Sequence, residues 1–157
     1  MRVGNVLMAL AVLLGAGGCA TQGGGARPAQ KSDNSTQALT DVFTCLSQAN
    51  RAELLSKYRD SGMSQERAVD AHLKTLNVAT EAEREESRPD AVKAAQYAYA
   101  NASLAPTHVA WRLFTQCRLE KAGIDSADTR RRLAEEGSKC PADDLKGCYQ
   151  RLFERLQ

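Results

Sequence analysis

The chain has 157 residues, with 21 Lys and Arg against 19 Asp and Glu, giving a formal net charge of +2. This balance excludes the concentrated basic footprint of a nucleic-acid-binding protein. Aromatic residues make up only 5% of the chain. Few large rings are therefore available to fill a core, and covalent cross-links between its elements have a clear use.

The first 18 residues have the pattern of a secretory signal peptide. Arg2 supplies a positive charge, the apolar stretch from Val6 to Leu14 is too short to cross a bilayer, and small residues follow at 15–18. A charged start, a short apolar stretch and a small-residue cleavage site define such signals. We therefore expect export of the chain, with cleavage directly before Cys19.

The run Leu14-Gly15-Ala16-Gly17-Gly18-Cys19 resembles the lipobox of bacterial lipoproteins. The resemblance implies cleavage after Gly18, a diacylglycerol on the Cys19 sulfur and an acyl chain on the new amino terminus. It also implies the outer membrane, with the body facing the periplasm, because Ala20 stands where retained lipoproteins carry aspartate. One acyl chain anchors a protein only marginally, whereas two anchor it stably. The alternative is an ordinary secretory peptide with a chance cysteine.

Residues 19–35 are predicted to be the lipidated cysteine and a flexible tether. They are rich in Gly, Gln and Ser and show no apolar periodicity. Such a segment cannot bury enough apolar surface to offset the entropy of ordering it. As a flexible coil it has a root-mean-square span on the order of 20–25 Å.

The remaining 36–157 are expected to form one helical domain. Apolar residues recur there at spacings of three and four, and no stretch alternates with a period of two for long enough to suggest a strand. A first helix is expected from Leu39 through Tyr58, ended by Gly62. A second is expected to start at Ser64 and to continue through Ala79 and the charged run 81–86.

Prolines and capping residues indicate where the later helices start. Proline suits the first helical position, which predicts helices beginning at Pro89 and at Pro106. Asp125 or Ser126 is expected to cap a short, charged fifth helix. A last helix carries an apolar stripe made of Leu145, Cys148, Tyr149, Leu152 and Leu156. The sequence thus predicts an all-α fold, an irregular bundle of five or six helices stapled by disulfides.

Four cysteines are left for this domain: Cys45, Cys117, Cys140 and Cys148. An even number in an exported chain, which folds where disulfides persist, predicts two bridges. Three pairings are possible, and we favour Cys45 with Cys117 and Cys140 with Cys148. No Cys-x-x-Cys pair is present, so we expect neither a thioredoxin-like site nor a metal centre.

The short bridge depends on where the last helix starts. With a start at Pro141, Cys140 and Cys148 would lie about 12 Å apart, beyond the roughly 7 Å that a disulfide spans. With Asp143 as the N-cap, the loop can fold back and the bridge becomes possible. The long bridge would close a loop of about 70 residues and stabilise the fold by about 4 kcal/mol.

No motif for catalysis is present, neither a nucleophile elbow nor a phosphate loop nor a zinc or calcium signature. We therefore expect no enzymatic activity and no cofactor. Asp70 and His72 are two residues apart, which places them on different faces of a helix and prevents a base–orienter pair. The basic run 130–132 is expected to pair with Glu135 and Glu136, one turn further on.

Two functions from different classes stay open. The first is a non-enzymatic protein-interaction or assembly-accessory module, anchored in the membrane by its lipid and bound to an envelope protein. This plan resembles, in architecture alone, that of the pilotins, small helical lipoproteins that escort secretin subunits. The second is a periplasmic protein that binds a small ligand or inhibits a partner. Its groove would involve four side chains, with His108 and Trp111 as the main candidates beside Tyr97 and Tyr99.

Overall fold

The computed structural model describes residues 32–77 and 80–157. The predicted signal peptide, Cys19 and most of the predicted tether lie outside these residues. The described chain consists of helices and contains no strand, which confirms the predicted all-α class. The helices are α1 (Ser32–Asp60), α2 (Gln65–Thr75), α3 (Glu81–Glu86), α4 (Arg88–Ala100), α5 (Pro106–Lys121), α6 (Ala127–Gly137) and α7 (Leu145–Leu156), with a 3-10 turn (Ala142–Asp144) directly before α7.

The first helix starts earlier than its apolar spacing indicated. α1 begins at Ser32, inside the segment 19–35 that was expected to be tether. Extending an existing helix adds one hydrogen bond per residue without a new nucleation step. The polar residues before Leu39 can therefore continue the helix although they carry no apolar signal.

The expected second helix is in fact two helices. α2 ends at Thr75, and Leu76 takes an extended conformation as its C-cap. Thr80 then starts α3 through a capping box, in which the Thr80 hydroxyl accepts from the Glu83 amide and the Glu83 carboxylate accepts from the Thr80 amide. A Thr-x-x-Glu sequence satisfies two amide groups that a helix start leaves unpaired. This local pairing explains why the charged run 81–86 forms a helix of its own; Ala79 lies outside the described residues.

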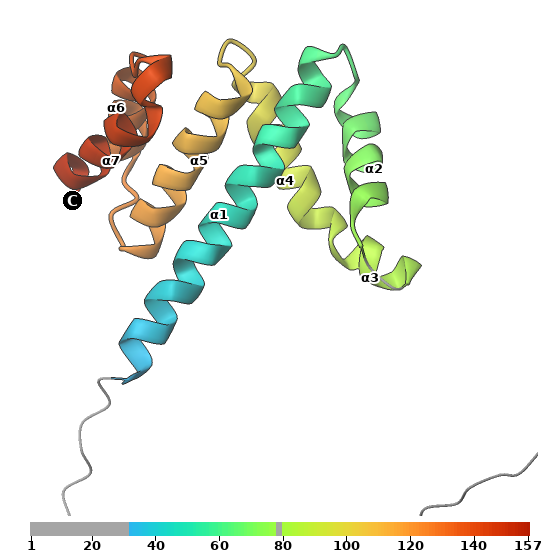
Figure 1. Cartoon of the computed structure of the whole chain (residues 1–157), viewed down its shortest axis with the longest axis horizontal. Helices are drawn as coiled ribbons and strands as arrows, with labels where there is room; N and C mark the ends of the chain where they lie inside the picture. The colour runs from blue at the N-terminus through green and yellow to red at the C-terminus, as the bar shows by residue number, and fades with distance from the viewer. Residues whose placement is uncertain (1–31, 78–79) are drawn as a thin grey trace, which may run out of the picture. The chain divides into compact units, whose positions relative to one another are not determined.

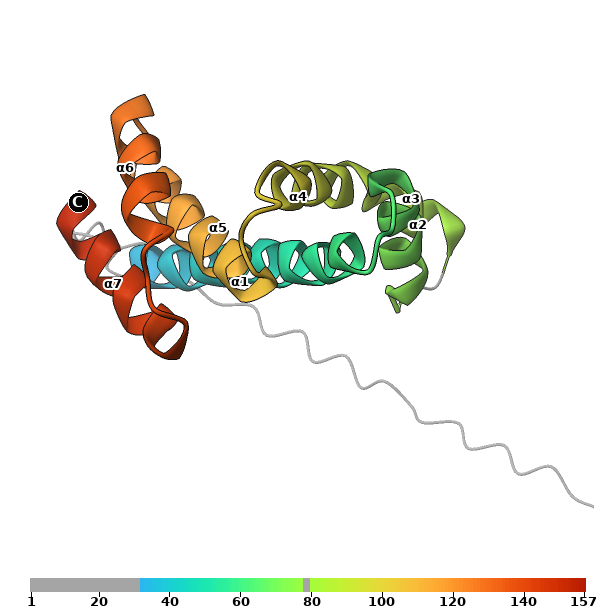
Figure 2. The ribbon, with the colours of Figure 1, turned by 90° about the horizontal axis from the view of Figure 1, so that it is seen from above.

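α1 is the long central element of this body (Figure 1). α4 and α5 both pack along it, α2 contacts α4 and the C-terminal part of α1, and α6 and α7 pack against α5 and each other (Figure 2). Two apolar clusters hold these helices together. The first joins α1, α2, α4 and α5 and contains many alanines, and the second joins α5, α6 and α7.

The two clusters are packed in different ways. In α4, Ala91, Ala94, Ala95 and Ala98 are all buried, so the neighbouring helices meet a surface with short side chains. The second cluster is built around Tyr149, which is 1% exposed and donates a hydrogen bond of 3.1 Å from its hydroxyl to the carbonyl of Gly137. A Cβ at position 137 would lie 2.8 Å from the Tyr149 ring. Glycine at position 137 therefore allows the Tyr149 ring to pack directly against the backbone of α6.

Both predicted disulfides are present. Cys45 of α1 is joined to Cys117 of α5, with a Cα–Cα distance of 5.5 Å, and Cys140 is joined to Cys148 across 5.7 Å. The N-cap of α7 is Asp144, one residue later than the Asp143 of our hypothesis. The 3-10 turn before it brings Cys140 back toward α7, so the short bridge can form.

A partly buried arginine, which the sequence did not point to, ties the end of α1 to the connection between α4 and α5. The guanidinium of Arg59 donates hydrogen bonds to the carbonyls of Ala98, Asn101 and Leu104, at 2.6, 3.1 and 2.9 Å. These carbonyls lie at and beyond the end of α4, where a helix leaves its last carbonyls without intrahelical partners. The carbonyl of Asn101 also accepts a hydrogen bond from the Leu104 amide, at 3.0 Å. Arg59 thus fixes where the chain turns from α4 into α5.

Candidate functional site

Four large apolar side chains lie exposed on the N-terminal half of α1. Leu39 is 61% exposed, Val42 40%, Phe43 67% and Leu46 43%. Their spacing of three and four residues places them on one side of the helix. We call these four side chains the α1 apolar face. The spacing of the same four residues predicted the helix, but no sequence pattern indicated that they would stay uncovered.

The face is exposed because the same helix buries a different side. Cys45, Ala49 and Ala52 are 0–3% exposed and point toward α4 and α5. The disulfide between Cys45 and Cys117 holds that side in place. The α1 apolar face therefore lies outside the core because α1 packs against α4 and α5 through its other side.

Leu46 is flanked by two hollows. The smaller, about 110 Å³, lies between α1 and α5, where Leu46 meets Trp111 and Phe114. The larger, about 450 Å³, lies between α1 and α2, where Phe43 and Leu46 are joined by Leu54 and Leu76. The surface of the α1 apolar face is therefore uneven, and Leu46 forms a ridge between two depressions.

Two acidic side chains, Asp41 within this part of α1 and Glu53 in the lining of the smaller hollow, already have partners. Asp41 Oδ1 lies 3.2 Å from Lys121 Nζ, and Lys57 Nζ lies 2.7 Å from Glu53 Oε1. The guanidinium of Arg118 lies over the rings of Phe114 and Phe153, at 5.6 and 3.8 Å from their centroids. Burial lowers the pKa of Arg118, with Glu154 acting in the opposite direction. The surroundings of the face therefore offer little free charge.

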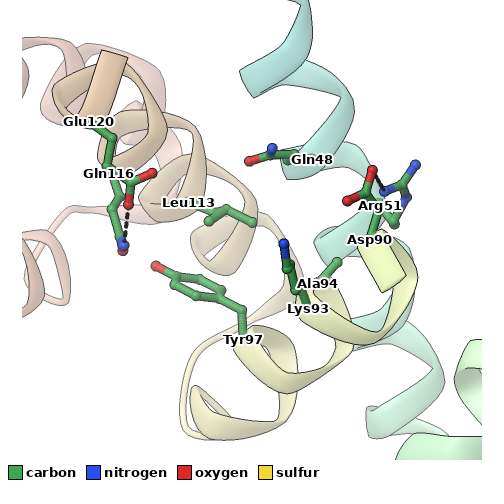
Figure 3. A pocket seen from close by; sticks show the side chains of 9 residues that line it. All are labelled: Gln48, Arg51, Asp90, Lys93, Ala94, Tyr97, Leu113, Gln116 and Glu120. Carbon is green, nitrogen blue, oxygen red and sulfur yellow. Dashed lines mark hydrogen bonds and ion pairs between the residues drawn. The ribbon is translucent and has the colours of Figure 1, made fainter. Parts of the chain in front are cut away.

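A third hollow, a more polar pocket of about 320 Å³, opens between α1, α4 and α5 (Figure 3). Arg51 and Asp90, 3.6 Å apart, lie at one end, and Gln116 donates a 2.9 Å hydrogen bond to Glu120 at the other. Tyr97 points toward this second end. Its hydroxyl is buried without a hydrogen-bond partner among the described residues, and burial raises its pKa.

The four side chains predicted to form a ligand groove lie in different places. Trp111 lines the smaller hollow and packs edge-on against Phe114, with centroids 5.8 Å apart. His108 lines none of the three hollows described above and stands edge-on to Tyr149, at 6.4 Å. Tyr97 lines the polar pocket, while Tyr99 donates a 2.6 Å hydrogen bond to the carbonyl of Met63. The structure therefore does not bring His108 and Trp111 together with the tyrosines in one hollow.

His72 is a buried histidine beside the α1–α2 hollow. It is 6% exposed, and neither ring nitrogen has a hydrogen-bond partner among the described residues. Burial, and next the charge of Arg51, lowers the pKa of His72. Asp70 bonds to Arg88 at 2.9 Å instead, so the two residues do not pair, as their spacing indicated.

Two residues of the basic run 130–132 pair with Glu135 and Glu136 as predicted, and the third pairs with an aspartate. Arg131 contacts Asp128 and Glu135, Arg132 lies 3.5 Å from Glu136, and Arg130 pairs with Asp125. No group of three His, Cys, Asp or Glu side chains that could hold a metal ion occurs in the described part of the chain. Within the same residues, no helix has the length and apolar content needed to span a bilayer.

Comparisons of the chain with protein-family models, curated proteins and solved structures gave no match. A function for this protein must therefore be argued from its own residues.

Proposed function

We propose that this protein is a membrane-anchored cell-envelope lipoprotein whose helical body is a non-enzymatic protein-interaction module. Cys19 would carry the lipid, as its resemblance to a lipobox cysteine implies, and the body would face the periplasm from the outer membrane. A role as an assembly accessory, of the kind that pilotins have, fits this plan. The observation that carries the interaction role is the exposed α1 apolar face.

Single exposed apolar residues are common on protein surfaces and need no explanation, whereas a contiguous group of them on one helix does. Such patches on a folded protein mark interaction sites. Here all four members are at least 40% exposed and follow one another along the helix. A helix in this state is suited to contact a partner through packed side chains.

The α1 apolar face also lies close in sequence to the proposed anchor. Ser32, the start of α1, is 13 positions after Cys19, with 12 residues between them, and a chain of that length reaches at most about 45 Å. An acylated Cys19 would therefore hold the face near the membrane surface. A partner assembled in or on that membrane would be within its range.

The anchoring half of the proposal is tested by metabolic labelling with a fatty acid. The wild-type chain should incorporate the label and sediment with membranes, whereas Cys19→Ser should do neither. Because the four remaining cysteines are all in disulfides, Cys19 is the expected thiol for modification. A labelled Cys19→Ser chain, or an unlabelled wild type, would contradict the anchor.

The second candidate is binding of a small ligand, and the observation that favours it is the polar pocket between α1, α4 and α5. Its volume of about 320 Å³ is at the lower end of ligand pockets. Its lining combines Arg51, Lys93 and Glu120 with the apolar Leu113. This candidate predicts that Lys93→Ala, at an exposed position, abolishes binding of a small-molecule hit found by screening while leaving the fold intact.

A further inference from the structure

The start of α1 is a regular helix with little around it. Every described residue from 35 to 40 is exposed. Among the side chains that the structure describes, the first ion pair along α1 that joins it to another helix is Asp41 with Lys121. Isolated helical segments of a few turns are marginal in water, and most helical stability comes from packing an apolar face. A helical neighbour on the α1 apolar face would supply that packing.

The low charge of residues 35–50 limits the kinds of partner that the α1 apolar face can bind. Between positions 35 and 50 the only charged residue is Asp41, which is already paired with Lys121. Helices that lie in a lipid surface usually carry Lys and Arg beside the apolar side, and this segment has neither. Two copies of a neutral face, by contrast, can meet without setting like charges opposite each other.

The relief of the face also fits a contact between copies. In a two-fold symmetric contact, each copy offers the same patch, so a ridge on one copy must meet a depression on the other. The ridge at Leu46 and the hollow beside it, lined by Trp111 and Phe114, lie side by side on one surface. One patch therefore holds both halves of such a contact.

We propose that the α1 apolar face binds the same face of a second copy of this chain. The inference rests on the proposed function, because anchoring confines the copies to one membrane and raises their effective concentration. Four partly exposed side chains offer only a few hundred Å², whereas stable pairs bury about 1,200–2,000 Å². The pair is therefore weak in dilute solution and forms on the membrane.

The experiment uses the full chain in cells, with a photo-crosslinking benzophenone side chain at position 43. Two differently tagged copies are co-expressed, and irradiation should give an adduct of two chains that carries both tags. The same probe at Gln96, an exposed residue of α4, is the matched control and should give no such adduct.

A charge pair at Leu46 then identifies the partner as a second copy. Leu46→Asp alone and Leu46→Lys alone should each lower the adduct about tenfold, which corresponds to about 1.4 kcal/mol of association free energy. Co-expression of the two variants should restore it. Leu46 itself lines the hollow into which Leu46 of the other copy inserts, so unlike charges then lie next to each other. Leu46 is 43% exposed, and circular dichroism with thiol titration confirms that each variant is folded and disulfide-bonded.

Three results would overturn the proposal: an adduct with a different protein only, an adduct with lipid only, or no recovery in the mixed pair. The anchor is scored separately by fatty-acid labelling. Loss of labelling with the two-tag adduct retained would refute the proposed anchor and leave the pairing in place. Normal labelling without the adduct would refute the pairing alone.

Discussion

The two halves of α1 differ in what surrounds them. In the C-terminal half, Ala52 and Leu55 are fully buried among α2, α4 and α5, and Arg59 is held by three carbonyls. In the N-terminal half, Leu39 and Phe43 are more than 60% exposed on a helix that is equally regular. The comparison teaches that apolar spacing reports a helix, whereas burial depends on which neighbours the rest of the chain provides.

The Cys45–Cys117 disulfide cross-links the N-terminal half of α1 to α5. Its loss should have the largest effect on the free energy of unfolding. It closes a loop with a sequence separation of 72, for which the chain-entropy relation gives about 4 kcal/mol. The Cys45→Ala/Cys117→Ala variant should lose about that much in urea unfolding. Cys140→Ala/Cys148→Ala, which opens a separation of 8, is the control and should lose about 2.5 kcal/mol. Equal losses would contradict the ranking.

Truncating one apolar side chain in each half tests the comparison directly. Leu55→Ala removes a fully buried side chain and should lower the free energy of unfolding by about 3 kcal/mol. Phe43→Ala removes a larger but 67% exposed side chain and should change it by less than about 0.5 kcal/mol. Denaturant unfolding of the Cys19→Ser chain in dilute solution measures both. A large loss for Phe43→Ala would show that the face belongs to the core.

Replacing Arg59 tests how the buried half is fixed. Arg59→Met keeps much of the side-chain volume but removes the guanidinium donor shared by the carbonyls of Ala98, Asn101 and Leu104. The Asn101 carbonyl keeps its hydrogen bond from the Leu104 amide. We expect a loss of about 2 kcal/mol, in the range for hydrogen bonds to a charged group. Arg67→Met, at an exposed position in α2, is the matched control and should be neutral. Similar stabilities for the two variants would exclude an anchoring role for Arg59.

The smallest expected effect is a pH dependence from His72. Its pKa is lowered in the folded state, so the unfolded chain binds a proton more readily once the pH falls below about 6.5. Stability should be constant above that pH and decline below it, by at most about 1.4 kcal/mol per pH unit, until the folded histidine also titrates. His72→Leu should remove this part of the slope. An unchanged slope would assign the pH dependence to other groups.

Much of the fold could be predicted from local signals. Helical spacing predicted the all-α class, Pro106 is the first residue of α5, and Ser126 caps α6 by accepting from the Thr129 amide. These features depend on neighbours in sequence, so a sequence pattern can reveal them. The break between α2 and α3 was missed, although Thr80 and Glu83 form a recognisable capping box.

The candidate site could be predicted far less well, because it depends on contacts between distant segments. The spacing of Leu39 and Phe43 is the same whether a helix covers them or not. His108 and Trp111 share α5, yet one faces Tyr149 and the other the hollow beside α1. No local pattern distinguishes those directions. The cysteine pairing, in contrast, was limited by the number of cysteines and by the distance that a disulfide can span, and the favoured pairing was correct.

Amide hydrogen exchange tests the central claim, that the N-terminal half of α1 is an interaction surface, most directly. The full acylated chain is reconstituted in neutral lipid vesicles at increasing numbers of copies per vesicle, and exchange is followed across α1. Our account predicts that protection of 35–46 rises about tenfold or more with copy number, while 49–59 stays protected throughout. Exchange in 35–46 that is equally fast at every copy number would contradict it.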